Sequence, residues 1–232
     1  MPRKARVAPG GLVYHVLNRA AGRTTLFRGD DDFAAFERVM LEAHERFPLR
    51  ILCYCLMSNH WHFVARPAKD GELTAFFRWL TNTHAMRWRV AHRTVGYGHL
   101  YQGRFKSFPI QCDGHLLTAC RYVERNALSA GLAKRAEHWR WGSLWARDNG
   151  RGELKALLSD WPVDRPRDWM QTVNTPLTPK ELDRLAASEA RGRPFGSEPW
   201  ITRMVSTLDL THTVRREGRP SKKAADARSD GN

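Results

Sequence analysis

The chain has 232 residues, and 38 Lys and Arg residues against 24 Asp and Glu residues give it a formal net charge of +14. The length favours one well-cored domain with additions, and the charge favours a polyanionic partner, nucleic acid ahead of an anionic membrane surface. No apolar run reaches the length of a membrane span, and residues 1–6 lack the apolar stretch of a signal peptide, so we expect a cytoplasmic protein.

The chain begins with a predicted strand and a predicted helix. Residues 11–19 have alternating β-type character. Apolar residues then recur at helical spacing over 33–47, after Asp30-Asp31-Asp32, which we expect to cap that helix. Pro48 should end it, because proline cannot continue a helix.

A hairpin and a long helix are expected next. Residues 50–57 and 60–65 predict two antiparallel strands joined by a tight turn at Ser58-Asn59. Residues 71–93 carry apolar side chains at spacings of three and four, which is one face of a helix.

A fourth strand over residues 105–111 and a helix over 115–128 complete the predicted core. Asp113 is placed to cap this helix and Gly131 to terminate it. The element order predicts an α+β fold of the ferredoxin-like split βαβ type, an antiparallel sheet with helices on one face.

We divide the chain into three parts. Residues 1–132 form the core domain, and 133–210 a helical and irregular extension packed on it, with short helices at 180–190 and 199–208. Residues 211–232 are polar and basic and predict a tail that is disordered without its partner.

Two histidines separated by one bulky residue stand on the predicted third strand. Alternate side chains of a strand share a face, so His60 and His62 point one way while Trp61 and Phe63 point the other. Two imidazoles can therefore reach one metal ion. Taken alone the pattern is weak, because two half-buried polar histidines would look the same.

The predicted helix over 115–128 adds a phenol and an amide. Tyr122 and Asn126 lie one turn apart at the flank of its apolar stripe, so the phenol can face a cleft. A boundary tyrosine with a surface asparagine is the simpler alternative. A tyrosine that cleaves a phosphodiester needs a cation beside the phosphorus, and Asn126 could ligate that ion as well.

Several motifs, in this order, resemble one known family. They are Tyr14-His15-Val16 with Asn18-Arg19, residues 57–63 (MSNHWHF), 98–107 (GHLYQGRFKS), 121–132 (RYVERNALSAGL), 139–143 (WRWGS) and 192–197 (GRPFGS). The chain is similar to the tyrosine (Y1) transposases related to the IS200/IS605 insertion sequences, most of all to the REP-associated tyrosine transposases, over nearly its whole length to about residue 205.

The resemblance implies a metal-dependent enzyme that cleaves and rejoins single-stranded DNA at hairpin, REP-like palindromic sequences. His60 and His62 would be the HUH motif, Asn126 the third metal ligand and Tyr122 the nucleophile that forms a 5′-phosphotyrosine. The implied ion is Mg²⁺ or Mn²⁺. Family members often carry proline where this chain has Ser58 and Ala127, and neither position touches a reacting atom.

Basic side chains are expected to hold the DNA, mainly through phosphate contacts. The candidates are Arg19, Arg104, Lys106, Arg121, Arg125 and Arg219. Arg121 and Arg125 should lie on the exposed side of the helix that carries Tyr122. Arg219 belongs to a tail that resembles a minor-groove hook, for which a solvated basic tail is the alternative. We expect a monomer, with a homodimer as the alternative.

Three other functions fit part of the pattern. A non-catalytic DNA-binding regulator could keep this fold, although all four chemical residues are present. A relaxase or replication-initiator nickase usually has another motif order or a third histidine. A zinc module could use Cys53, Cys55, His60 and His62, but no C-x-x-C pair exists, and we expect all four cysteines, Cys112 and Cys120 included, to be reduced core residues.

Overall fold

The computed structural model describes residues 7–150 and 152–215, so Arg219 and most of the expected tail lie outside the described residues. Four strands form one sheet in the order β2-β3-β1-β4, with antiparallel neighbours throughout. They are β1 (Val13–Arg19), β2 (Arg50–Met57), β3 (His60–Arg66) and β4 (Lys106–Ile110). This is the predicted split βαβ arrangement, in which β3 lies between β1 and β2.

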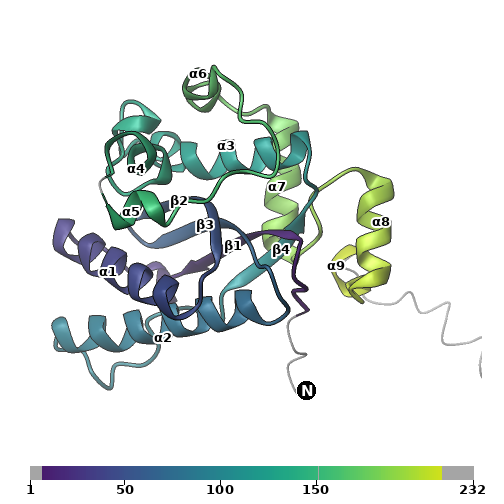
Figure 1. Cartoon of the computed structure of the whole chain (residues 1–232). Coiled ribbons are helices and arrows are strands. Elements are labelled where there is room, and N and C mark those ends of the chain that lie inside the picture. Colours follow the sequence, from purple (N-terminus) through teal and green to yellow (C-terminus); the bar gives the residue numbers. More distant parts are fainter. Residues whose placement is uncertain (1–6, 151, 216–232) are drawn as a thin grey trace, which may run out of the picture.

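Helices cover both faces of this sheet (Figure 1). Helices α1 (Asp30–Arg46) and α2 (Glu72–Ala91) pack together on one face, as the prediction of helices on one face requires. Helix α3 (Gly114–Ser129), which follows the split βαβ pattern, packs on the opposite face against β2, β3 and β4. The prediction is therefore incomplete, because the second sheet face is also apolar and needs a cover.

Alternation along the strands produces two apolar cores. Trp61 and Phe63 point into the core under α1 and α2, whereas Val64 belongs to the core under α3. His62 shares the face of Val64, and its ring contacts the ring of Tyr122 on α3. The predicted split between the histidines and their apolar neighbours is present in the structure.

The helix ends follow the sequence signals in part. The Asp113 side chain accepts a hydrogen bond from the backbone N–H of His115 and caps α3 as predicted, and Gly131 follows the end of α3 with φ of 71°. The expectation that Asp30-Asp31-Asp32 cap the first helix is wrong. These residues form its first turn after Gly29, where acidic groups favour the positive end of the helix dipole.

The extension consists of short helices. It contains a 3-10 turn, Ala136–His138, and the helices α4 (Ser143–Asn149), α5 (Glu153–Ala156), α6 (Trp169–Asn174), α7 (Pro179–Arg191), α8 (Glu198–Thr207) and α9 (Thr211–Val214). Another 3-10 turn, Ala21–Arg23, follows β1 in the core domain. Helix α9 shows that the expected tail is helical at its beginning, although residues 211–214 carry no apolar pattern.

The extension pairs with both edges of the sheet. On the β2 edge, the backbone N–H of Leu56 donates to Trp141, and Ile51 accepts from Ser159. On the β4 edge, Phe195 exchanges backbone hydrogen bonds with Pro109 and Gln111. These contacts satisfy polar groups that an open edge would leave to solvent or to another chain.

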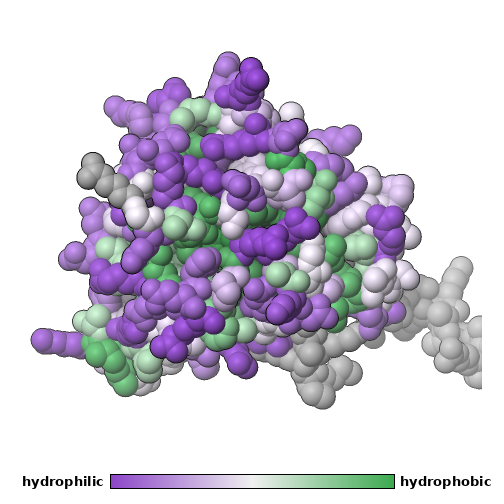
Figure 2. Space-filling model, viewed as in Figure 1, coloured by the Kyte–Doolittle hydropathy of each residue, from purple (hydrophilic) through white to green (hydrophobic). Residues whose placement is uncertain are grey.

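Two further findings concern the surface. Three cysteines are buried and reduced as expected, but Cys112 is exposed because it stands in the turn between β4 and α3. Hydrophilic residues cover most of the face in Figure 2, and hydrophobic ones gather over its middle, between the two layers of helices. Among the residues described, no helix combines the length and apolarity that a membrane span requires.

Candidate metal and nucleophile site

Strands β1 and β3 bring three histidines to the sheet face that α3 covers. Leu17 stands opposite His62 and Arg19 opposite His60, so His15 is the diagonal neighbour of His62 on the same face. His15 Nε2 lies 2.9 Å from His62 Nδ1, and the rings of His60 and His62 are 5.0 Å apart between centroids. The two histidines predicted to act together do lie side by side, and His15 joins them.

The surroundings of these histidines keep the imidazoles neutral. Burial lowers the pKa of His15 to about 3, and burial with the nearby charge of Arg19 lowers the pKa of His60 to about 4. Burial, together with the neighbouring imidazoles, holds the pKa of His62 well below its ordinary range. Neutral imidazole has a lone pair on one nitrogen, which is the form that binds metal ions.

The tautomer of His60 is set by its neighbour. His60 Nδ1 lies 2.6 Å from the Asn59 side-chain oxygen, which can only accept a hydrogen bond. Nδ1 therefore carries the proton, and Nε2 keeps the lone pair. A hydrogen bond to the second nitrogen is the usual way in which a metal-binding histidine is oriented.

Helix α3 places Tyr122 above the histidines. Its ring centroid is 5.8 Å from that of His62 and 6.1 Å from that of His15, both edge to face. The residues of α3 that point into the core include Cys120, Val123 and Ala127, so Tyr122 stands at the border of the apolar stripe. Burial, followed by the nearby carboxylate of Glu189, raises the pKa of Tyr122, and a hydrogen bond with Asn126 opposes that rise.

Glu189, on α7, is a second member of the site, after His15, to which the sequence analysis gave no role. Its Oε1 lies 3.7 Å from His62 Nδ1 and 3.9 Å from His15 Nδ1. Burial raises the pKa of Glu189 to about 7, although Tyr122, Arg19 and Lys106 oppose the rise. Because both imidazoles are neutral, these contacts are not ion pairs.

The donor set fits a divalent ion. His15, His62 and Glu189 each offer one ligand atom, and the three atoms lie within 4.8 Å of one another. Two buried atoms of this cluster, His15 Nδ1 and Glu189 Oε1, have no hydrogen-bond partner among the described residues. Unpartnered buried polar atoms are costly, and a cation would satisfy the carboxylate. The cluster shares His62 with the predicted set of His60, His62 and Asn126.

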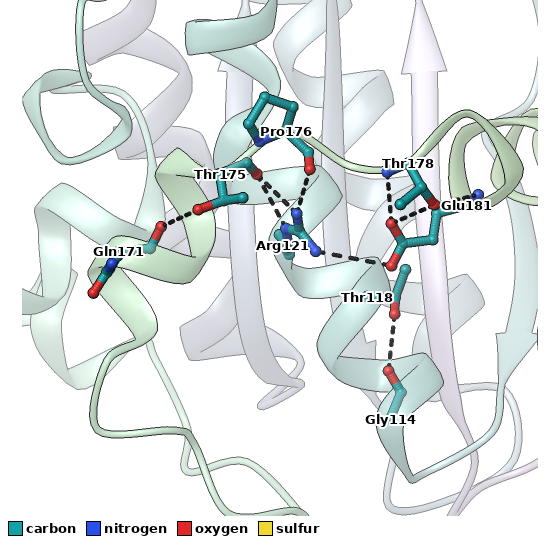
Figure 3. A network of polar contacts seen from close by, with 8 residues as sticks. All are labelled: Gly114, Thr118, Arg121, Gln171, Thr175, Pro176, Thr178 and Glu181. Atoms are coloured by element: carbon teal, nitrogen blue, oxygen red, sulfur yellow. Dashed lines mark hydrogen bonds and ion pairs between the residues drawn. The ribbon is translucent and has the colours of Figure 1, made fainter.

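A network around Arg121 fixes α7 beside α3 (Figure 3). The Arg121 guanidinium donates to the backbone oxygens of Thr175 and Pro176 at 2.5–3.2 Å, and it lies 3.8 Å from the Glu181 carboxylate. Glu181 also completes a capping box with Thr178 at the start of α7. The helix that carries Glu189 is thus anchored at its first turn.

The expectation that Arg121 and Arg125 lie on an exposed side of α3 is wrong. Arg125 donates to the backbone oxygens of Val173 and Asn174, next to the carbonyls that Arg121 binds. The end of α6 and the residues that follow it cover this side of α3. The two guanidinium groups hydrogen-bond to the carbonyls of residues 173–176, at the C-terminal end of α6. Both arginine side chains therefore stabilise the packing of α6 on α3.

The remaining basic candidates lie nearer the site. Arg19 acts electrostatically on His60, His62, Tyr122 and Glu189, and Lys106 Nζ is 3.4 Å from the backbone oxygen of Glu189. Arg104 and Lys106 line a cavity of about 450 Å³ between β4 and the α7–α9 segment. The cavity therefore opens beside the helix that carries Glu189.

Comparisons with known proteins agree with this picture. Residues 10–126, or 117 of 232, match the family model described as "Transposase IS200 like". A solved structure described as "Structure of the REP associates tyrosine transposase bound to a REP hairpin" is similar at 17% identity and a TM-score of 0.52, covering 71% of this chain and 92% of that one. At this identity the likeness shows the shared fold. The search of curated proteins found no match.

Proposed function

The chain belongs to the family of IS200-like transposases, and we propose that it is an active Y1 enzyme that cleaves and rejoins single-stranded DNA through Tyr122. The observation that carries the proposal is the position of this phenol. Tyr122 stands edge to face over His62 and His15 at the border between core and site, beside a set of metal-binding groups. A structural tyrosine would not require neutral histidines and a carboxylate oxygen without a hydrogen-bond partner next to it.

Tyr122 would act as the nucleophile in a transesterification. Its oxygen forms a bond to phosphorus, the bond from phosphorus to the 3′ oxygen breaks, and the 5′ phosphate stays on the protein. The phenol gives up its proton in this attack, and the leaving 3′ oxygen takes up one proton to become a free 3′-hydroxyl. The phosphotyrosine bond keeps the energy of the cleaved bond, so another 3′-hydroxyl can attack it and rejoin the strand.

His60 and His62 of the HUH motif, with Asn126, would hold Mg²⁺ or Mn²⁺. When bound, the ion would act as a Lewis acid that neutralises the non-bridging phosphate oxygens. The protein prepares the site by burying the imidazoles in their neutral form and by setting the tautomer of His60 through Asn59. Asn126 also hydrogen-bonds to Tyr122, which would orient the phenol.

The DNA substrate we propose is a single strand that folds back into a REP-like hairpin. This choice is supported by the description of the similar structure, which is bound to a REP hairpin. Arg19, Arg104 and Lys106 are the proposed phosphate contacts, because Arg19 and Lys106 act on the site and Arg104 lines the cavity beside α7, whereas Arg121 and Arg125 bind the protein's own carbonyls. The proposed site draws on β1, β3, α3 and α7 of one chain, so a monomer suffices.

Adduct formation tests this function. The full chain is incubated with Mn²⁺ and a labelled hairpin oligonucleotide, and the products are separated on a denaturing gel. Wild type should give a covalent adduct that EDTA prevents, and Tyr122→Phe should give none while still binding the hairpin. Tyr97→Phe is the matched control, since Tyr97 is exposed on the loop after α2.

The same experiment separates the rival function. A non-catalytic DNA-binding regulator would bind the hairpin in a native gel and form no adduct with any metal. An adduct that persists in Tyr122→Phe would show that another residue is the nucleophile. His60→Ala should reduce cleavage at least about tenfold through loss of a metal ligand.

A further inference from the structure

The carboxylate of Glu189 lies beside the HUH histidines, where it hydrogen-bonds with Tyr122 and where Arg19 and Lys106 act on it electrostatically. Its Oε1 has no hydrogen-bond partner, although it lies within 4 Å of nitrogens of His15 and His62. Lys106 does not supply the missing contact, because its Nζ donates to the backbone oxygen of Glu189. A buried carboxylate oxygen without a donor is unfavourable unless a cation is bound, and Oε1 of Glu189 is such an atom.

The distances in the cluster are those between ligands of one ion. Ligand atoms that each lie about 2.1 Å from a divalent ion are about 3.0 Å apart at a right angle and about 4.2 Å apart on opposite sides. Here His15 Nε2 and His62 Nδ1 are 2.9 Å apart, so that they hydrogen-bond to each other when no ion lies between them, and Glu189 Oε1 is 3.7 Å from His62 Nδ1. A small adjustment of side chains would bring all three groups to one ion.

The backbone holds Glu189 at this place. Helix α7 has a capping box with proline in its first turn and ends at Gly192, which has φ of 73°. Arg184 binds the backbone oxygen of Gly196, which ties the middle of α7 to the segment that pairs with β4. Glu189 therefore reaches the site from a fixed helix, as a ligand should.

We propose that Glu189 is a direct ligand of the ion held by His62, so that the C-terminal extension supplies part of the metal site. This proposal rests on the proposed function for the presence of the ion. An ion that prefers six ligands has room for the Glu189 carboxylate and for the two imidazoles within reach of it, those of His15 and His62, with positions left for phosphate oxygens or water. The matched family region ends at residue 126, so Glu189 lies outside it.

Mn²⁺ binding to the full chain without DNA tests the proposal by a readout other than activity. Isothermal titration and the loss of free-Mn²⁺ signal in electron paramagnetic resonance would be measured for wild type, Glu189→Gln and Glu45→Gln. Glu45 is an exposed control on α1. We expect Glu189→Gln to weaken Mn²⁺ binding at least about tenfold and Glu45→Gln to leave it unchanged. About tenfold is the smallest loss of metal affinity typical of residues that only orient a ligand, and a direct ligand should cost at least as much.

Each outcome has a defined meaning. If wild type and Glu189→Gln bind Mn²⁺ equally, Glu189 is not a ligand and the proposal is wrong, whereas the function proposed for Tyr122 stands if the adduct still forms. If Glu189→Gln binds Mn²⁺ equally and binds the hairpin more tightly, the carboxylate is an internal competitor of phosphate, which also overturns the proposal. If wild type binds no Mn²⁺ and forms no adduct with any metal, the proposed function is wrong, and so is the proposal for Glu189 that rests on it.

A metal dependence of the reaction provides a second test. Glu189→Gln should need at least about ten times more Mn²⁺ for half of its maximal adduct yield, and saturating Mn²⁺ should restore most of the yield. A low yield at saturating Mn²⁺ with an unchanged half-maximal concentration would contradict a ligand role. Far-UV circular dichroism and thermal unfolding in EDTA confirm that the variant is folded.

Discussion

Replacing Glu189 by glutamine should change how the stability of the metal-free protein depends on pH. The pKa of this carboxyl is about 7 in the folded protein against an ordinary value of 4.5, because the group is buried. A raised pKa in an acid means that the folded state binds the proton more tightly than the unfolded state does. The contribution of this carboxyl group to the free energy of unfolding is complete below about pH 4.5, and it is lost as the pH rises through about 7.

The size of the effect follows from these two values. At about 1.4 kcal/mol for each pH unit, the interval from 4.5 to about 7 corresponds to about 3 kcal/mol in the free energy of unfolding. The side chain is 20% exposed, so solvent screening makes this an upper value. Glutamine does not titrate. The difference in stability between wild type and Glu189→Gln should therefore fall by about 2 to 3 kcal/mol between about pH 5 and about pH 8.

Urea unfolding followed by tryptophan fluorescence, in EDTA, measures this difference at a series of pH values. Other titrating groups are common to both proteins and cancel when the two are compared. A constant difference across the range would refute the reasoning, because it would mean that the carboxyl has an ordinary pKa in the folded state. Adding Mn²⁺ at about pH 8 should stabilise wild type more than Glu189→Gln, since binding to the folded state alone stabilises it.

Substitutions at three further positions separate folding from DNA binding. Glu124→Ala should lower the free energy of unfolding by about 3 kcal/mol, because Ser143 and Trp169 lose a buried acceptor, and Glu124→Gln, which keeps one oxygen, should cost less in the same urea titration. Arg121→Ala should cost about 2 kcal/mol in stability and leave the salt dependence of hairpin binding unchanged, while Lys106→Ala should reduce the slope of log K against log salt by about 1. A reduced slope of log K against log salt for Arg121→Ala would show that Arg121 contacts the DNA.

The core of the fold could be predicted because its signals are local. Two apolar runs rich in strand-forming residues, 50–57 and 60–65, with a polar turn between them, define a hairpin whichever helices pack on it. The alternation of side chains along a strand placed His60 and His62 on one face, and the helical period placed Tyr122 at the border of a stripe. Each of these conclusions needs only the geometry of one element.

The exposed side of α3 could not be predicted in this way. Its polar residues Arg121 and Arg125 have the sequence pattern of a solvated helix face. They are instead paired with carbonyls of residues 173–176, about 50 residues further along the chain. An arginine that hydrogen-bonds to the carbonyls of another segment and an arginine that binds a phosphate have the same sequence pattern, since both stand on the polar side of an amphipathic helix.

Glu189 was missed for a related reason, although α7 itself was predicted. Four residues after the buried Leu185, and next to the buried Ser188, it belongs to the inner side of an amphipathic helix, where a glutamate is unusual. This was the available signal, but it does not say which cluster the carboxylate meets. The backbone pairing of Phe195 with β4 brings the end of α7 to the site. The extension therefore covers a sheet edge and, through Glu189, takes part in the electrostatics of the site.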